Sequence, residues 1–283
     1  MNLSSNGNIV YSASESLSLG IACSLIASVY LPLYMTLIWI LATNDEYDRV
    51  IFYRILAHLS VANVLSLTSA FTGGIFELTR ATFYPAIGNT AGSFSAWFRI
   101  AYTFLNIILC VNQLSVVFDF NIPYENDVHK YFVFLLWYAL VVLVLMTVYL
   151  DFDFSYDFAT HYFHDPTQRL ELAINVVRHT TTVVYLIVIC KLLYSKFVRR
   201  ESLEETSLRI LYRAFAVHFP TGIHSTIYQL FSKNIEASDV VRIPHLIFFR
   251  SLSALTITIV LLLDRNLRSE VHRLAKKAKS RCC

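Results

Sequence analysis

Apolar residues are concentrated in seven stretches of the chain, and polar residues fall mainly between these stretches. Each stretch is long enough to cross a hydrocarbon core of about 30 Å as a helix that rises about 1.5 Å per residue. The pattern therefore predicts seven membrane-spanning helices joined by short connections. Their expected ranges are 18–41, 51–75, 93–118, 130–150, 170–194, 207–231 and 242–263.

The composition favours lipid as the solvent for most of the chain. Of its 283 residues, 56% are hydrophobic and 15% are charged, and the mean hydropathy is +0.53. Soluble domains carry about 25% charged residues. We expect one all-α domain, a seven-helix bundle over 18–263. It follows an N-terminal tail over 1–17 and precedes a basic C-terminal tail over 264–283.

The distribution of Lys and Arg between the spans predicts the orientation of the bundle. With the N-terminus outside, only Arg80 and Lys233 lie on the outer side, and the outer connection 151–168 contains four Asp residues. A sequon at Asn2 is a weak glycosylation candidate on the same side. Twelve basic residues lie on the cytoplasmic side: Arg49, Lys130, Lys196, Arg199, Arg200, Arg265, Arg268, Arg273, Lys276, Lys277, Lys279 and Arg281.

The segment after the last span has the pattern of an amphipathic helix on the inner leaflet. Its basic residues occupy one face, and the C-terminal Cys282 and Cys283 are candidates for palmitoylation. A tail with unmodified thiols is the alternative. The apolar residues at helical spacing are Leu267, Val271, Leu274 and Ala278.

Four motifs resemble nematode serpentine chemoreceptors. They are FYRILAHLSVANVLSL at 52–67, GGIFELTRATFYPAIGNTAGSFSAWF at 73–98, ILCVNQLSVVF at 108–118 and LLLDRNLRSEV at the end of the last span. Within the Srg superfamily the chain is most similar to class Srt, and class Srx is the alternative. The resemblance implies a G-protein-coupled chemosensory receptor in the plasma membrane, specifically that of a sensory cilium. Its ligand would be an external small molecule, an odorant or a soluble cue, and its partner a heterotrimeric G protein.

The chain departs from the family pattern at the inner end of the third span. Asn112-Gln113 stands where these receptors carry Asn-Arg, and Gln lacks the charge that normally faces the G protein. We expect Asn112, Gln113, Arg199 and Arg200 to face the G protein, and a receptor-like protein that no longer signals is the alternative. The seventh span contains no Lys, so a retinal Schiff base is excluded.

Ionisable residues inside spans are costly and require a partner or a function. Counting along the helices places four of them in the outer half of the bundle. As a ligand-binding group they would favour an anion or an acceptor-rich molecule, because Arg binds carboxylate with two hydrogen bonds. The alternative is a structural role, in which hydrogen bonds and ion pairs hold the helices together. The four residues are Arg99, Arg178, His224 and Arg250.

Other classes of function fit the sequence less well. A transporter or channel would show inverted repeats or interrupted spans, and neither is present. An intramembrane metal hydrolase needs coordinating His and Asp at helical spacing, which the spans lack. We therefore expect a protein that is not an enzyme. We also expect no cofactor, no metal site and no nucleic-acid partner, and we expect the surrounding membrane lipids to be the remaining partner.

Overall fold

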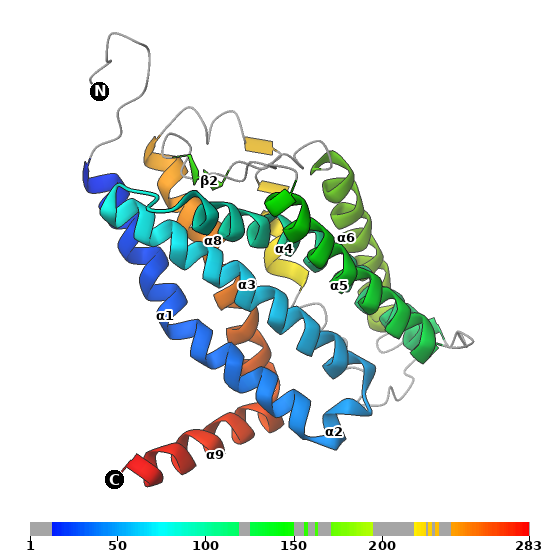
Figure 1. The fold of residues 1–283 in the computed structure, drawn as a ribbon. Coiled ribbons are helices and arrows are strands. Elements are labelled where there is room, and N and C mark those ends of the chain that lie inside the picture. Colours follow the sequence, from blue (N-terminus) through cyan, green and yellow to red (C-terminus); the bar gives the residue numbers. More distant parts are fainter. Residues whose placement is uncertain are drawn as a thin grey trace.

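The structure is a bundle of long helices with a shorter helix turned away from one end (Figure 1). The computed structural model describes residues 13–118, 125–149, 156–157, 162–163, 171–194, 218–224, 226–227, 230–231 and 239–282. The helices are α1 (Ala13–Thr43), α2 (Asp45–Asp48), α3 (Ile51–Thr79), α4 (Pro85–Phe118), α5 (Glu125–Tyr149), α6 (Glu171–Tyr194), α8 (Asp239–Leu263) and α9 (Arg265–Cys282). Two short strands, β1 (Tyr156–Asp157) and β2 (Tyr162–Phe163), pair antiparallel.

Long helices occupy six of the predicted spans, and in the range predicted for the remaining one, 207–231, residues 218–224 are helical. α3 continues to Thr79 instead of ending at 75, and α4 begins at Pro85 instead of 93. Proline is well suited to the first position of a helix, because it has no N–H to leave unsatisfied there. The small residues that follow are buried, as Ala91 and Ser93 show. The prediction followed the apolar residues and therefore began this helix too late.

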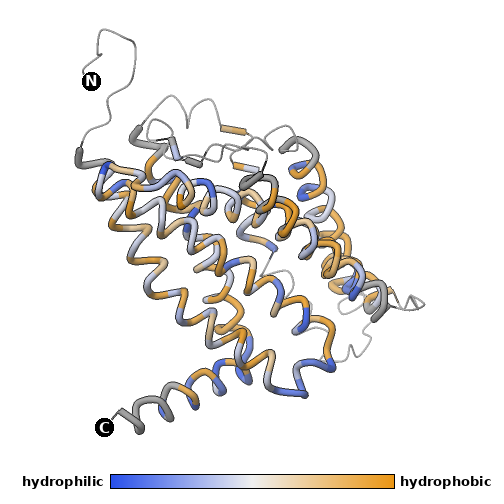
Figure 2. Tube along the Cα trace, in the orientation of Figure 1, coloured by the Kyte–Doolittle hydropathy of each residue, from blue (hydrophilic) through white to orange (hydrophobic). Residues whose placement is uncertain are grey.

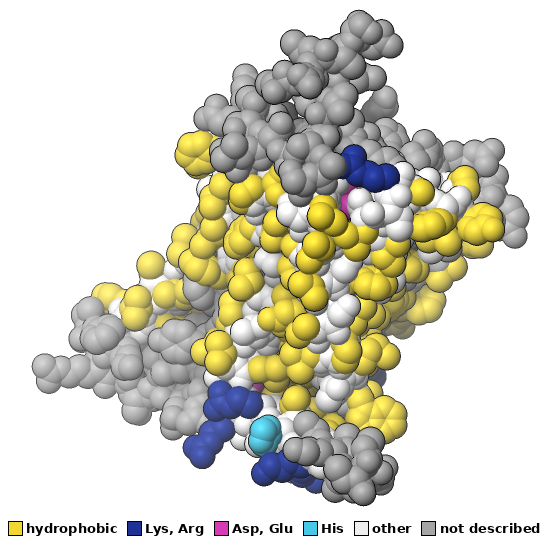
Figure 3. Space-filling view, turned by 90° about the vertical axis from the view of Figure 1, so that its left-hand side faces the viewer, with side chains coloured by type: hydrophobic (Ala, Val, Ile, Leu, Met, Phe, Trp, Pro, Cys, Tyr) yellow, Lys and Arg dark blue, Asp and Glu magenta, His cyan; other side chains and the backbone are white. Residues whose placement is uncertain are grey.

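The apolar surface of the bundle suits a lipid environment. Among the described residues, five helices are long and apolar enough to cross a membrane: Ser16–Thr43, Ile51–Thr79, Pro85–Ser115, Ile174–Tyr194 and Ile243–Leu263. Hydrophobic colour runs along their length in Figure 2, and apolar side chains cover the middle of the face shown in Figure 3. Leu25, Val29 and Met35 of α1 are 61%, 63% and 59% exposed. Such positions cost nothing when they face hydrocarbon.

Tyrosine hydroxyls join the first helix of the bundle to α8. Tyr34 is buried and donates a hydrogen bond to the Ser253 carbonyl oxygen at 2.6 Å, and Thr258 donates to the Tyr30 hydroxyl at 3.3 Å. Helices in lipid gain little from the hydrophobic effect against one another, so such hydrogen bonds and close packing hold them together. The two hydrogen bonds attach α1 to α8 and so join the first and the last long helices of the bundle.

Two glycines allow α1 and α3 to approach closely. A Cβ atom added to Gly20 would lie 2.9 Å from the Gly74 carbonyl oxygen, and one added to Gly74 would lie 3.1 Å from the Gly20 carbonyl oxygen. Small residues at a helix interface bring backbones together and so increase the van der Waals contact that drives helix association in membranes. The packing of α1 on α3 depends on the absence of these side chains.

Two tryptophans connect α3, α4 and α5. Trp97 of α4 is fully buried and donates to the Leu136 carbonyl oxygen at 3.2 Å, while Trp137 donates through Nε1 to Nδ1 of His58 at 3.2 Å. The indole rings of the two tryptophans are 5.0 Å apart between centroids. An indole N–H is a donor only, so burial requires an acceptor nearby. His58 supplies one from α3.

Asp264 forms the joint between α8 and α9. Its Oδ1 accepts hydrogen bonds from the backbone N–H groups of Asn266 and Leu267 at 3.1 and 3.2 Å, and its Oδ2 accepts from the Tyr53 hydroxyl at 2.7 Å. A carboxylate at this position satisfies the free N–H groups of the first turn and interacts favourably with the helix dipole. The predicted amphipathic helix is present, with Leu267 of its apolar face fully buried.

We expect Asp264→Ala to loosen α9. The substitution removes an N-cap and the acceptor of Tyr53, and loss of an N-cap alone costs about 1 kcal/mol. Hydrogen–deuterium exchange should therefore become several-fold faster in peptides from α9. Asp48→Ala, at an exposed position of α2, is the matched control and should leave this exchange unchanged. Equal exchange in the Asp264 variant and the natural chain would contradict the capping role.

Candidate functional site

Several buried polar groups lie toward one end of the bundle. We call this the hairpin end, because α3 ends there, α4 begins there and the β1–β2 pair lies there; α9 leaves from the opposite end, the α9 end (Figure 1). Three polar groups lie in the hairpin half. Each joins elements that are far apart in the sequence.

The first group is the Arg250 cluster, formed by Cys23, Glu77, Tyr156 and Arg250. The Tyr156 hydroxyl donates to Glu77 Oε1 at 2.6 Å, and Arg250 Nη2 lies 3.4 Å from the same hydroxyl oxygen, to which it donates. Arg250 Nη1 donates to the Cys23 sulfur at 3.4 Å. The cluster thereby joins α1, α3, β1 and α8. Glu77 is only 1% exposed, so its charge is compensated within the protein.

Tyr156 can donate to Glu77 only while it keeps its proton. Burial raises the pKa of this phenol from its ordinary value of 10.0, and the positive charge of Arg250 acts in the opposite direction. Burial disfavours the charged phenolate and outweighs the attraction of the guanidinium. The bond from Tyr156 to Glu77 is therefore intact throughout the neutral pH range.

The second group is the Arg178 cluster, which joins α4, α6 and segment 218–224. Arg178 Nε donates to the Thr103 hydroxyl oxygen at 3.0 Å, and Nη2 donates to the Arg99 carbonyl oxygen at 3.3 Å. One turn further along α6, the Thr182 hydroxyl lies 2.8 Å from His218 Nε2. The guanidinium is thus held by neutral acceptors of α4.

The third group is the histidine pair, His224 and His245. Their Nε2 atoms are 3.1 Å apart, and their ring planes are inclined by 22° with centroids 4.9 Å apart. The Phe249 ring lies 4.9 Å from the His224 ring. The pair joins segment 218–224 to α8.

The comparison with known families matches this architecture. The model of the family described as serpentine type 7TM GPCR chemoreceptor Srt matches residues 5–282. The chain belongs to the Srt family of serpentine chemoreceptors. No curated protein matches the chain. The family assignment confirms the predicted class Srt, the seven-helix membrane fold and the expected multi-pass membrane protein, and it is a family of receptors, not of enzymes.

The structure brings together some of the residues that were predicted to bind ligand in this Srt receptor. Arg99 and Arg178 meet through the Arg99 carbonyl oxygen, whereas His224 is paired with His245. Arg250 belongs to a different group with Glu77 and Tyr156. In this conformation Arg178, His224 and Arg250 contact protein groups, as the structural alternative expects. Their role in ligand binding stays a prediction.

Asn112 and Gln113, two of the residues predicted to face the G protein, lie near the C-terminal end of α4, away from the hairpin end. Asn112 is 9% exposed and Gln113 is 1% exposed, and the Gln113 side-chain amide donates to Asn112 Oδ1 at 3.3 Å. In this conformation of the receptor, Gln113 is inside the bundle. Arg199, Arg200, Asn2 and Cys283 lie outside the described residues, as does the side chain of Cys282.

Sequence reasoning missed Glu77, Tyr156 and His245. Glu77 lies beyond the predicted end of the second span, and Tyr156 lies in a connection whose aspartates and histidines, but not its tyrosines, suggested a role. A signal was present for Glu77, which is an acid within a mostly apolar segment, GGIFELT, and such an acid requires a partner. His245 is separated from His224 by 20 residues, so no spacing rule for one helix could pair them.

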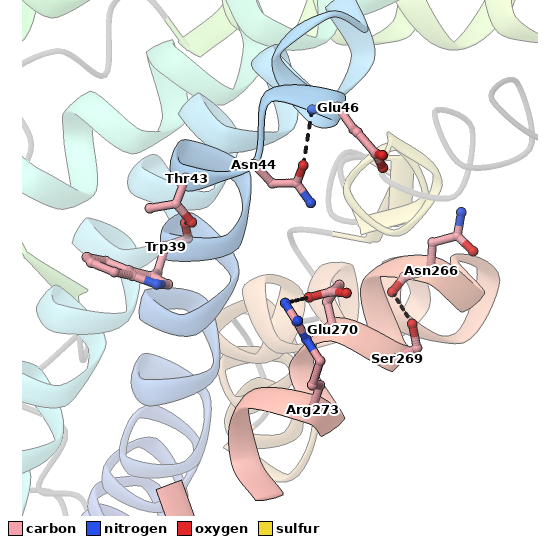
Figure 4. A network of polar contacts seen from close by, with 8 residues as sticks. All are labelled: Trp39, Thr43, Asn44, Glu46, Asn266, Ser269, Glu270 and Arg273. Carbon is pink, nitrogen blue, oxygen red and sulfur yellow. Dashed lines mark hydrogen bonds and ion pairs between the residues drawn. The ribbon is translucent and has the colours of Figure 1, made fainter. Parts of the chain in front are cut away.

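A cavity of about 440 Å³ lies at the α9 end, between the end of α1, α2 and α9. It is lined by Trp39, Asp45, Glu46, Glu270 and Arg273 among others, and Figure 4 shows this region. Arg273 donates to Glu270 at 2.6 Å on the surface of α9. The pair is exposed, so it contributes little to stability. The cavity contains charges of both signs and is remote from the hairpin end.

Proposed function

We propose that this Srt receptor binds an external small molecule at the hairpin end and signals to a heterotrimeric G protein at the α9 end. The N-terminus lies outside the plasma membrane in this proposal, as the distribution of Lys and Arg supports. By family resemblance the site of action is a sensory cilium. The ligand is an odorant or a soluble chemical cue, and an anionic group on it would suit Arg178.

One observation carries the proposal: the polar groups of the hairpin end each join different helices. The Arg178 cluster links α4, α6 and segment 218–224, and the histidine pair links that segment to α8. A ligand that exchanges hydrogen bonds with these groups changes the relative stability of two packings of the bundle. Such a difference is what a ligand needs in order to shift a conformational equilibrium.

The buried position of Gln113 supports the same two-state mechanism. A G protein can contact this side chain only after neighbouring helices move apart, because it is 1% exposed in the present packing. The basic face of α9 would lie on the anionic inner leaflet, and acyl chains on Cys282 and Cys283 would strengthen that attachment. Arg199 and Arg200 complete the cytoplasmic surface of the proposal.

The proposal is tested in reporter cells exposed to volatile and water-soluble compounds, carboxylates included. For an active carboxylate, we expect Arg178→Met to raise the half-maximal concentration about tenfold or more, because a hydrogen bond to a charged group contributes about 1.5–3 kcal/mol. Arg178→Lys should keep part of the response. Arg80→Met, an exposed arginine at the same end, is the matched control and should respond like the natural receptor.

Surface expression separates the possible outcomes. An N-terminal epitope detected on intact cells measures expression and tests the orientation together. Loss of the epitope in Arg178→Met would indicate a structural role for this arginine. A natural receptor that reaches the cell surface but gives no reporter response to any compound in the panel would contradict the proposed signalling function.

A further inference from the structure

In the histidine pair, two imidazole rings from different elements lie nearly parallel and bring their Nε2 atoms together. His224 is 8% exposed, and its ring lies nearly parallel to that of His245, with the two Nε2 atoms 3.1 Å apart. Because nitrogen is the only polar atom in either ring, one Nε2 must donate and the other must accept. The accepting nitrogen therefore directs its lone pair toward its partner.

The distance between the two nitrogens is close to that of a metal chelate. Two imidazole nitrogens bound to one tetrahedral zinc ion at about 2.0–2.1 Å stand about 3.3 Å apart. The observed 3.1 Å differs from this by a few tenths of an ångström. Rotation of the rings about their Cβ–Cγ bonds directs both lone pairs to one point, since this torsion is soft in histidine.

We propose that His224 and His245 together bind a divalent transition-metal ion, Zn²⁺ or Cu²⁺, between segment 218–224 and α8. Imidazole nitrogen is a preferred ligand for both ions. Binding replaces the hydrogen bond between the rings. The ring that donated through Nε2 moves its proton to Nδ1, so both Nε2 lone pairs reach the metal and no proton is lost.

The remaining coordination positions are open to small molecules. Within the described ranges, no group of three or more His, Cys, Asp and Glu side chains is placed to hold a metal ion together. Water or an added ligand therefore completes the coordination shell, as at sites that keep an open position. The aromatic rings of Phe248 and Phe249 lie 6.1 and 4.9 Å from the His224 ring and supply an apolar wall.

The ion would act as a cross-link within the bundle. It joins segment 218–224 to α8, which also meet through the rings of His224, Phe248 and Phe249, so separation of the two elements would break a metal–nitrogen bond. This consequence concerns binding and stability, and it holds whether or not the receptor couples to a G protein. A packing in which the two elements separate would be disfavoured by the metal.

The test uses the full-length receptor, purified in detergent, with Cys282 and Cys283 replaced by serine so that the terminal thiols do not bind zinc. Zn²⁺ and Cu²⁺ are titrated separately, and bound metal and the apparent melting temperature are both measured. We expect one ion to bind, the melting temperature to rise, and Cu²⁺ to bind more tightly than Zn²⁺. Mg²⁺ should have no effect, because it prefers oxygen ligands.

The variants His224→Gln and His245→Gln keep a polar group of similar length and should each weaken Zn²⁺ binding at least about tenfold. His272→Gln, on the exposed face of α9, is the matched control and should bind as the parent does. If His224→Gln fails to fold, the Zn²⁺ affinity of His245→Gln, whose substitution lies at a partly exposed position, is compared with that of the parent. A parent that binds no Zn²⁺, or a folded His245→Gln that binds it as tightly as the parent, would overturn the proposal.

Discussion

We expect the Glu77→Ala receptor to be about 3–5 kcal/mol less stable than the natural chain, because removing one member of a buried charged group leaves the other buried charge uncompensated. Glu77 is 1% exposed and accepts a hydrogen bond from the Tyr156 hydroxyl at 2.6 Å, and the same hydroxyl lies 3.4 Å from Arg250. The measurement is the apparent melting temperature in detergent. A large decrease would show that the Arg250 cluster holds α1, α3, β1 and α8 together.

A graded series tests the reason for this loss. Tyr156→Phe removes only the hydroxyl and should cost about 1–3 kcal/mol, less than loss of the carboxylate. Glu46→Ala at an exposed position of α2 and Tyr131→Phe at a position that is 71% exposed are the matched controls. Both should stay within about 0.5 kcal/mol of the natural chain. Equal melting temperatures for Glu77→Ala and Glu46→Ala would disprove a buried charge network.

The second large effect is expected at the contact of α1 with α3, where Gly74→Ala should cost about 1–3 kcal/mol. The new Cβ would lie 2.9 Å from Ser24 Oγ, 3.1 Å from Cys23 Cβ and 3.1 Å from the Gly20 carbonyl oxygen. A side chain can turn away, but the carbonyl oxygen belongs to the backbone of α1. The two helices must therefore separate, and surface expression should fall with the melting temperature.

Gly88→Ala is the matched control for this substitution. A Cβ at Gly88 would meet only Phe76 Cε2, at 3.8 Å, which is an ordinary contact. Alanine also has a higher helix propensity than glycine by about 1 kcal/mol, so this variant should be neutral or slightly stabilised. Similar expression of the two alanine variants would mean that α1 and α3 do not need the close approach.

Taken with the Arg250 cluster, the glycine contact explains why α1 is fixed in the bundle at two places near the hairpin end. Gly20 and Cys23 lie one turn apart on α1, and they meet α3 and α8 respectively. Tyr34 binds α8 further along the same helix. In the proposed signalling, we therefore expect movement in α6 and segment 218–224, because α8 is held to α1 by these contacts.

The sequence by itself was sufficient to predict the membrane spans, the amphipathic tail and the family. Each of these properties is local. A long run of apolar residues favours the hydrocarbon core whichever helices it packs against. Helical spacing likewise places Leu267, Val271 and Leu274 on one face of α9 wherever that helix lies. The motifs around Asn63 and Asn112 were likewise recognisable without a structure. The predicted ends of two spans were wrong, at Thr79 and Pro85, because the apolar pattern does not register a buried acid or a proline that begins a helix.

The partners of the buried polar groups were decided by the tertiary structure alone. The sequence predicted that Arg250 and Arg178 need partners, yet it did not indicate Tyr156 or Thr103, because the rotation of each helix about its axis and the choice of neighbouring helices are set by packing across the whole bundle. The pairing of His224 with His245 and the contact of Gly20 with Gly74 arise in the same way. They depend on distances between helices, and no periodicity within one helix contains those distances.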